Sequence, residues 1–155
     1  MNLDLGSGDP SNPHIINYDG DDVIHADIDR RAYHLEVLCD AHFLPFREKA
    51  FGSVLASQVL EHFDNPLQAL KEMARCSNKV VIRVPNARFS TFIGDEEHLF
   101  NWNSRTLQNL LERVFPNVDV HLSKRFSPKR GKVRRIMTFI LTYVLAPNEL
   151  TAVCH

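Results

Sequence analysis

The stretch LDLGSGDP, at residues 3–10, joins a short apolar strand to a turn that contains two glycines. Gly6 and Gly8 lack a Cβ atom, so the backbone can turn sharply there and approach a ligand closely. A strand that leads into such a turn is typical of nucleotide-binding α/β domains, although short G-x-G turns also occur for structural reasons alone. The residues that follow the next strands decide between these interpretations.

Acidic residues end the next two predicted strands. Asp27 follows the apolar start of a strand at Val23, and Asp29 lies two positions further. A carboxylate about 20 residues after a glycine turn can accept hydrogen bonds from both hydroxyls of a ribose. Asp40 follows a third candidate strand at residues 35–39, where a carboxylate can accept a hydrogen bond from the amino group of an adenine. Each acid alone could be a solvated strand end, but their order favours an adenosine site.

Strands and helices alternate along the middle of the chain. Strands are predicted at residues 51–57 and 79–84, and the stretch PLQALKEMARC (66–76) between them is predicted as a helix. Asn65 followed by proline indicates the start of this helix. Its predicted apolar face consists of Leu67, Leu70, Met73 and Ala74. The alternation indicates an α/β domain with a mostly parallel sheet.

The last third of the chain predicts one more helix and two strands. Ser104 is the expected cap of the helix, and Pro116 stops it. Its apolar face is expected to consist of Leu107, Leu110, Leu111 and Val114. The two strands are expected at residues 118–122 and 136–145, and the lack of a helix between them suggests an antiparallel hairpin. The segments after the first two strands are poor helix formers, so reduced helix cover and self-association as a homodimer are expected there.

The composition is that of a soluble globular protein, with 44% apolar residues, 24% charged residues and a net charge of −1. The length of 155 residues predicts one domain that spans residues 1–155. The three cysteines are widely spaced and no H-x-x-x-H pattern occurs, so neither a disulfide framework nor a metal site is expected. The acidic start does not resemble a signal peptide and no apolar run could span a bilayer, which predicts a cytoplasmic protein without membrane contact.

A basic segment, Lys124 to Arg135, contains seven lysines and arginines and no acid. Such a segment could bind the phosphates of a nucleic acid, or it could be a solvated hairpin tip that protects a sheet edge. The net charge of the chain favours the hairpin tip, because nucleic-acid binders usually carry net positive charge.

Five segments occur in an order that resembles the class I S-adenosylmethionine-dependent methyltransferases, most of all a compact type 11-like subgroup. They are LDLGSGDP (3–10), HADID (25–29), CDAHFLPF (39–46), FGSVLASQVLEHFDNPLQALKEMAR (51–75) and VVIRVPN (80–86). The resemblance covers residues 2–115. It implies a Rossmann-like fold whose seven-stranded, mostly parallel sheet has an antiparallel last strand. It also implies S-adenosylmethionine as the cofactor.

The resemblance assigns cofactor contacts to individual residues. Gly6 and Gly8 would face the methionine part of the cofactor, and Gln58 would lie beside it. Asp27 would hold the ribose, while Asp40 and Ala41 would contact the adenine. Three neighbours in the same motifs are also expected among the cofactor-binding residues: Asp4, Ser7 and Ile28.

Departures from the family pattern leave other functions open. Pro10 stands where many members have a third glycine, and the helices expected before and after the first strand are missing. A degenerate methyltransferase fold that acts as a binding or regulatory partner is therefore an alternative. A nicotinamide-dependent oxidoreductase is another, but its G-x-G-x-x-G spacing fails at Ser11.

Candidate catalytic residues lie after the fourth predicted strand and in the loop at residues 88–102. Methyl transfer mainly requires that donor carbon and nucleophile be held in line at about 3 Å, and a base helps only when the nucleophile must lose a proton. His62 and His98 are candidate bases, and Glu61 is a polar candidate beside them. Structural alternatives exist for two of them: His62 could be a packed histidine with locally bonded nitrogens, and Glu61 could cap or brace a neighbouring loop. The acceptor is expected to be a small molecule that the sequence does not name.

Overall fold

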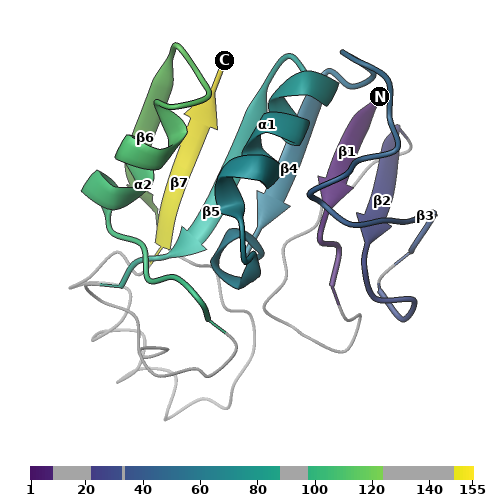
Figure 1. Ribbon diagram of the computed structural model, residues 1–155, viewed down its shortest axis with the longest axis horizontal. Helices are drawn as coiled ribbons and strands as arrows, with labels where there is room; N and C mark the ends of the chain where they lie inside the picture. The colour runs from purple at the N-terminus through teal and green to yellow at the C-terminus, as the bar shows by residue number, and fades with distance from the viewer. Residues whose placement is uncertain (9–21, 33, 88–97, 124–148) are drawn as a thin grey trace, which may run out of the picture.

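The computed structural model describes residues 1–8, 22–32, 34–87, 98–123 and 149–155, and in them seven strands form one sheet (Figure 1). The strands are β1 (Asn2–Leu5), β2 (Val23–Asp27), β3 (Val37–Leu38), β4 (Ser53–Ser57), β5 (Val80–Pro85), β6 (Val118–Ser123) and β7 (Glu149–Cys154). The helices are the 3₁₀ turn η1 (Leu60–His62), α1 (Pro66–Cys76) and α2 (Ser104–Leu111).

The order of the strands across the sheet is β3-β2-β1-β4-β5-β7-β6. β1 pairs in parallel with both β2 and β4, and the parallel pairing continues to β3 on one side and β5 on the other. β7 lies between β5 and β6 and is antiparallel to both. The predicted fold class, a mostly parallel seven-stranded sheet with an antiparallel last strand, is confirmed.

Two strand boundaries differ from the prediction. The antiparallel partner of β6 is Glu149–Cys154, and the predicted strand at residues 136–145 lies outside the described residues. Leu150, Ala152 and Cys154 are fully buried and alternate with half-buried residues. Such an alternation indicates a strand less strongly in the sequence than the continuous apolar run at 136–145 does. β3 has only two residues, Val37 and Leu38, instead of the five predicted at 35–39.

Helix α1 begins where the sequence predicts. The side chain of Asn65 accepts a hydrogen bond from the backbone N–H of Gln68 at 3.2 Å, and proline occupies the first helical position. The buried face contains Leu70 and Met73, as predicted, but Leu67 and Ala74 are only half-buried. The other buried residues of the helix are Pro66, Ala69 and Cys76.

Helix α2 is capped one residue earlier than predicted, at Asn103 rather than Ser104. Asn103 Oδ1 accepts from the backbone N–H of Thr106 at 3.0 Å, and Thr106 Oγ1 accepts from the backbone N–H of Asn103 at 3.0 Å. This reciprocal capping box satisfies two N–H groups that the helix itself leaves without partners. Leu107 and Leu111 are buried, whereas Leu110 and Val114 are half-buried.

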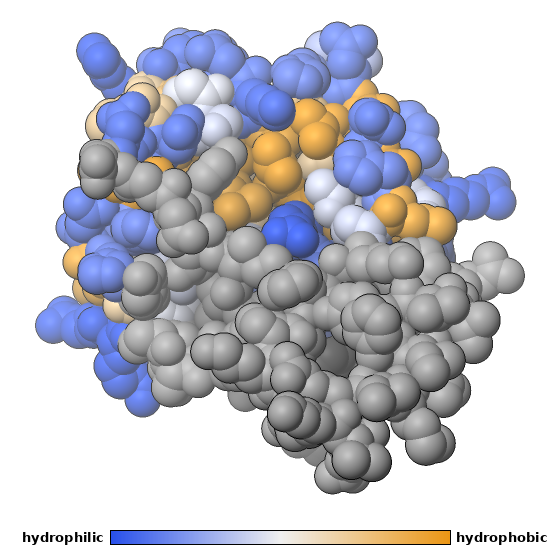
Figure 2. All heavy atoms as spheres, turned by 180° about the vertical axis from the view of Figure 1, so that it is seen from behind, coloured by the Kyte–Doolittle hydropathy of each residue, from blue (hydrophilic) through white to orange (hydrophobic). Residues whose placement is uncertain are grey.

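Both α-helices lie on the same face of the sheet (Figure 1). The main core fills the space beneath them and includes Phe51, Ile82 and Leu107, each at most 2% exposed. No α-helix of the described residues covers the other face, where apolar surface is visible (Figure 2). Helix cover is thus reduced among the described residues, which do not include the segment 9–21 after β1, and self-association through this face remains a prediction. None of the described helices is long and apolar enough to cross a membrane.

Candidate cofactor-binding site

A cavity of about 460 Å³ opens beyond the carboxyl ends of β1, β2 and β4. Open α/β sheets bind their ligands at this edge, and pockets for small molecules commonly measure about 300–1,000 Å³. The lining residues come from the segments that follow these strands and from η1. They are Leu5, Gly6, Gly8, Asp27, Ile28, Cys39, Asp40, Ala41, His42, Ser57, Gln58, Val59, His62, Phe63 and Asp64.

The glycine turn after β1 can be formed only by glycine at its first position. Gly6 and Gly8 have φ angles of +76° and +71°, in the left-handed region that other residues rarely adopt. A Cβ atom on Gly6 would lie 2.1 Å from Cγ1 of Val59. The missing side chain therefore lets the turn pack directly against the segment that follows β4, and both segments form one wall of the cavity.

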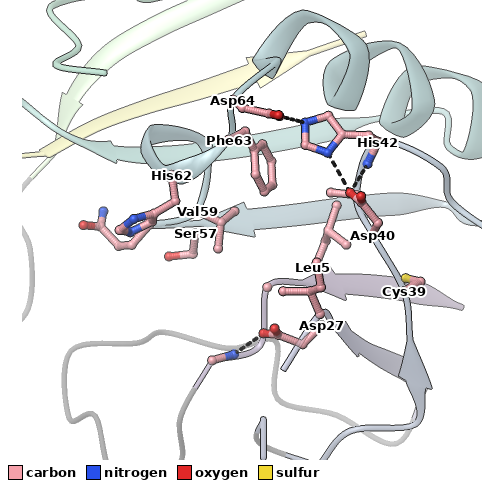
Figure 3. Close-up of a pocket in the computed structure, with 15 residues that line it drawn as sticks. Leu5, Asp27, Cys39, Asp40, His42, Ser57, Val59, His62, Phe63 and Asp64 are labelled. Atoms are coloured by element: carbon pink, nitrogen blue, oxygen red, sulfur yellow. Dashed lines mark hydrogen bonds and ion pairs between the residues drawn. The ribbon is translucent and has the colours of Figure 1, made fainter. Parts of the chain in front are cut away.

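Asp27 connects the end of β2 to the glycine turn. Its Oδ2 accepts from the backbone N–H of Gly8 at 2.8 Å (Figure 3). Its Oδ1 accepts from the backbone N–H of Asp29 at 2.9 Å. Each carboxylate oxygen has two lone pairs, so both oxygens can still accept a ligand hydroxyl. Asp27 lines the cavity, and its contact with a ribose stays a prediction.

Asp29 has a different role from Asp27. Its carboxylate forms an exposed ion pair with Arg31, with a distance of 2.7 Å between Oδ2 and Nη2. The side-chain hydrogen bonds from Arg31, followed by the backbone N–H of Arg31, lower the pKa of Asp29 to about 2. Asp29 is not among the cavity-lining residues. It therefore offers a matched control for experiments on Asp27.

Asp40 and His42 form the opposite wall, together with Asp64 (Figure 3). Asp40 Oδ1 accepts from the backbone N–H of His42 at 2.9 Å and lies 2.6 Å from His42 Nδ1. The backbone N–H of His42, and then its ring, hold the pKa of Asp40 below its ordinary value. His42 Nε2 lies 3.1 Å from Asp64 Oδ1, so the imidazole bridges the segments that follow β3 and η1.

Helix α1 fixes the loop that follows Asp40. Arg75 donates to the carbonyl oxygens of Phe46 at 2.7 Å and Leu44 at 2.9 Å, and Glu72 accepts from the backbone N–H of Leu44 at 2.9 Å. Glu72 and Arg75 also form an ion pair, with Oε2 and Nη2 separated by 2.7 Å. Glu72 and Arg75 thus hold the segment Leu44–Phe46 against helix α1.

Gln58 shows two signs of a binding residue. Its φ angle of +58° is unusual for a residue other than glycine, and such conformations cost about 1–3 kcal/mol and cluster at functional sites. Its amide nitrogen is buried and has no hydrogen-bond partner among the described residues. Because Gln58 lines the cavity, a ligand acceptor would satisfy this donor.

Cys39 also lines the cavity, although the sequence did not single it out as a site residue. Burial, followed by the nearby charges of Asp27 and Asp40, raises the pKa of its thiol to about 11. The thiol therefore stays protonated at neutral pH and is a poor nucleophile.

The three candidate catalytic residues lie close together at one side of the cavity. His62 lines the cavity, and its ring centroid is 4.8 Å from that of His98. Glu61 is only 1% exposed and lies behind this wall. The backbone carbonyl of Glu61 accepts from the N–H groups of Leu99 at 2.9 Å and Phe100 at 3.2 Å. These bonds hold the segment that carries His98 against η1.

Some predicted site residues do not reach the cavity. Asp4 lies within the sheet, with its Oδ2 at 3.1 Å from His25 Nδ1, and neither Asp4 nor Ser7 is a lining residue. Glu61 and His98 lie behind or beside the lining rather than in it. The basic segment Lys124 to Arg135 and the departures at Pro10 and Ser11 lie outside the described residues. The remaining lining residues have no site role predicted from the sequence, although all are close neighbours of predicted ones: Leu5, Cys39, His42, Ser57, Val59, Phe63 and Asp64.

Comparison with known proteins finds methyltransferases of the same fold. Residues 3–79 match the family model described as "Methyltransferase domain". No curated protein matches the chain. The fold is similar to that of a SAM-dependent methyltransferase from Archaeoglobus fulgidus, with a TM-score of 0.66 and 17% identity, over 99% of this chain and 84% of that one.

Two further solved structures show the same fold. A putative methyltransferase in complex with the Trm112 methyltransferase activator of Haloferax volcanii has a TM-score of 0.72 and 12% identity, over 99% of this chain and 80% of that one. A SAM-dependent methyltransferase from Thermotoga maritima, a possible histamine N-methyltransferase, has a TM-score of 0.65 and 12% identity, with the same coverage of 99% and 80%.

The chain therefore has the class I methyltransferase fold. The resemblance found in the sequence is confirmed, since the family match covers the glycine turn, Asp27, Asp40 and Gln58. This match supports S-adenosylmethionine as the cofactor of the domain.

Proposed function

We propose that this chain binds S-adenosylmethionine in the cavity at the ends of β1, β2 and β4 and transfers its methyl group to a small-molecule acceptor. The observation that carries the proposal is the convergence of the glycine turn, Asp27 and Gln58 on one cavity. The match of residues 3–79 to a methyltransferase domain supports the same assignment.

The lining residues fit each part of this cofactor. The unpartnered amide nitrogen of Gln58 suits an anionic acceptor such as the methionine carboxylate. The glycine turn lines the cavity, so its backbone can approach the methionine part of the cofactor closely. The remaining lone pairs of Asp27 suit the two ribose hydroxyls, and Asp40 suits the amino group of adenine.

The chemistry required of the protein is mainly positional. The sulfonium of the bound cofactor would supply an electrophilic methyl group. The chain must hold the acceptor in line with that methyl carbon at about 3 Å, which can supply most of the rate acceleration. We assign contact with the methyl acceptor to His62 and His98, because His62 lines the cavity and His98 lies next to it. An imidazole there can take the proton of the acceptor or hold an ion that acidifies it.

Calorimetric titration of the full chain with S-adenosylmethionine, S-adenosylhomocysteine and NAD tests the proposal. We expect saturable binding of the first two and none of NAD. Asp27→Ala should weaken binding by at least about 1 kcal/mol, or roughly fivefold, because the ribose hydroxyls lose their acceptor. Asp29→Ala is the matched control and should bind like the wild type, since its carboxylate pairs with Arg31 instead.

The outcomes separate the competing functions. Binding of NAD would favour an oxidoreductase. A folded chain that binds none of the three ligands would refute the proposal and support the degenerate partner protein. An effect of Asp29→Ala larger than that of Asp27→Ala would show that the ribose acid has been misassigned.

A further inference from the structure

Three potential metal ligands converge at the carboxyl end of β4. One ligand atom each from Glu61, His62 and His98 can be chosen such that all three lie within 4.8 Å of one another. Glu61 is buried, His98 is half-buried and His62 is exposed toward the cavity. The cluster therefore reaches from the protein interior to the wall of the proposed cofactor site.

The fold, rather than sequence spacing, creates this cluster. Glu61 and His62 lie in the 3₁₀ turn η1, and His98 comes from a segment far along the chain. The carbonyl oxygen of Glu61 accepts from the N–H groups of Leu99 and Phe100, so the residues next to His98 are tied to η1 by two backbone hydrogen bonds. The sequence predicted no metal site because spacing rules detect only ligands that lie near one another in the chain.

We propose that Glu61, His62 and His98 form a binding site for a divalent transition metal ion, with zinc as the reference ion. Two imidazoles and one carboxylate are the donor set of many catalytic sites, which keep further coordination positions open for a substrate. Ligand atoms about 2.1 Å from one ion are roughly 3.4 Å apart at a tetrahedral angle. The separations between these atoms, up to 4.8 Å, need to shorten by up to about 1.4 Å, which side-chain rotations can provide.

The position of the site suggests its use and rests on the proposed function. His62 lines the same cavity as Gln58 and Asp27, so an ion held there would face the acceptor. We infer an acceptor with a hydroxyl group beside a second oxygen donor, because two adjacent oxygens can occupy open positions on one ion. The ion lowers the pKa of the bound hydroxyl, whose proton leaves to solvent.

The transfer then balances in atoms and charge. The deprotonated oxygen forms a bond to the methyl carbon while the carbon–sulfur bond breaks. The electron pair of that bond stays on the sulfur, so the products are a neutral thioether and a methyl ether. In this arrangement His62 and His98 act as ligands, and the acceptor is activated by the ion rather than by a histidine base.

Metal titration of the tag-free, metal-stripped full chain tests the site. We expect one equivalent of Zn²⁺ by calorimetry, and one equivalent of Co²⁺ whose visible absorption bands report ordered coordination. His98→Ala should lower both affinities at least tenfold, and Glu61→Gln should have a similar effect. His121→Ala is the control, because this exposed histidine of β6 lies outside the cluster and should leave binding unchanged.

The metal site, its role toward the acceptor and the proposed function each fail on a different result. Absence of saturable binding, or binding that survives His98→Ala in a protein with wild-type circular dichroism, would overturn the metal site. Catechol, used as a probe with two adjacent hydroxyls, should shift the Co²⁺ bands, and no shift would overturn the acceptor role. Since S-adenosylhomocysteine should bind equally well to the metal-stripped chain, loss of the metal site leaves the proposed function intact. Conversely, Zn²⁺ binding that depends on His98, without binding of S-adenosylhomocysteine, would refute only the proposed function and the acceptor role.

Discussion

Replacing Gly6 with alanine should destabilise the domain through two separable effects. Its φ angle of +76° costs a residue with a Cβ atom about 1–2 kcal/mol. The new Cβ would also lie 2.1 Å from Cγ1 of Val59, and overpacking of this kind typically costs about 1–3 kcal/mol. The sum of about 2–5 kcal/mol corresponds to a fall in Tm of about 4–20 °C for a domain of this size.

A double-mutant cycle separates the two effects. Val59→Ala removes both methyl groups that the new Cβ atom would meet, at 2.1 and 3.3 Å, and of the three nearest atoms leaves the Val59 Cβ at 3.0 Å. The combination Gly6→Ala/Val59→Ala should therefore recover the overpacking cost but not the backbone strain. We expect a favourable coupling energy of about 1–3 kcal/mol between the two substitutions, measured by urea unfolding.

Gly52→Ala serves as the control for replacing a glycine. A Cβ atom there would meet nothing closer than Oδ1 of Asn2 at 3.5 Å, which is an ordinary contact. Its free energy of unfolding should change by less than about 0.5 kcal/mol. The explanation of the glycine turn would be refuted if Gly6→Ala were as stable as Gly52→Ala, or if the effects of Gly6→Ala and Val59→Ala were simply additive.

Two further predictions concern the helices. Hydrogen bonds from Arg75 hold the pKa of Glu72 below its ordinary value of 4.5, so its stabilising contribution is complete above about pH 5 and is lost as the pH falls through the lowered pKa. Glu72→Gln should therefore cost about 1–2 kcal/mol at pH 7 and progressively less toward pH 3, as measured by urea unfolding; an equal cost at both pH values would contradict this role. Asn103→Ala should lower the free energy of unfolding by about 1 kcal/mol, whereas Ser104→Ala should change it little, and thermal denaturation that ranks them the other way would restore Ser104 as the cap.

The elements with strong local signals could be predicted from the sequence. The β-branched run at Val80–Pro85 and the asparagine–proline start of α1 appear where their local patterns indicate. β7 was missed because its buried positions are filled partly by small residues, Ala152 and Cys154, and alternate with residues such as Thr151. Its place between β5 and β6 is decided by long-range pairing, which a local window does not contain.

Site residues could be predicted where each follows the end of its own predicted strand. Spacing identified Asp27 and Asp40, and the structure places both in the lining of the cavity. Spacing could not show that His42 bridges Asp40 and Asp64, because that contact depends on how two loops pack. The sequence thus predicts which single residues can bind a ligand, whereas the contacts between these residues become known only from the fold.

The central position of β7 has a consequence for how the chain folds during synthesis. β5 is complete once residue 85 has been made, but its neighbour in the sheet, Glu149–Cys154, is translated more than 60 residues later. Among the described strands, β5 then has an edge open to other chains and β6 still lacks its partner. A ribosome that stalls before residue 149 would therefore release a product with an unpaired, aggregation-prone edge, and these few residues decide whether the nascent protein closes on itself.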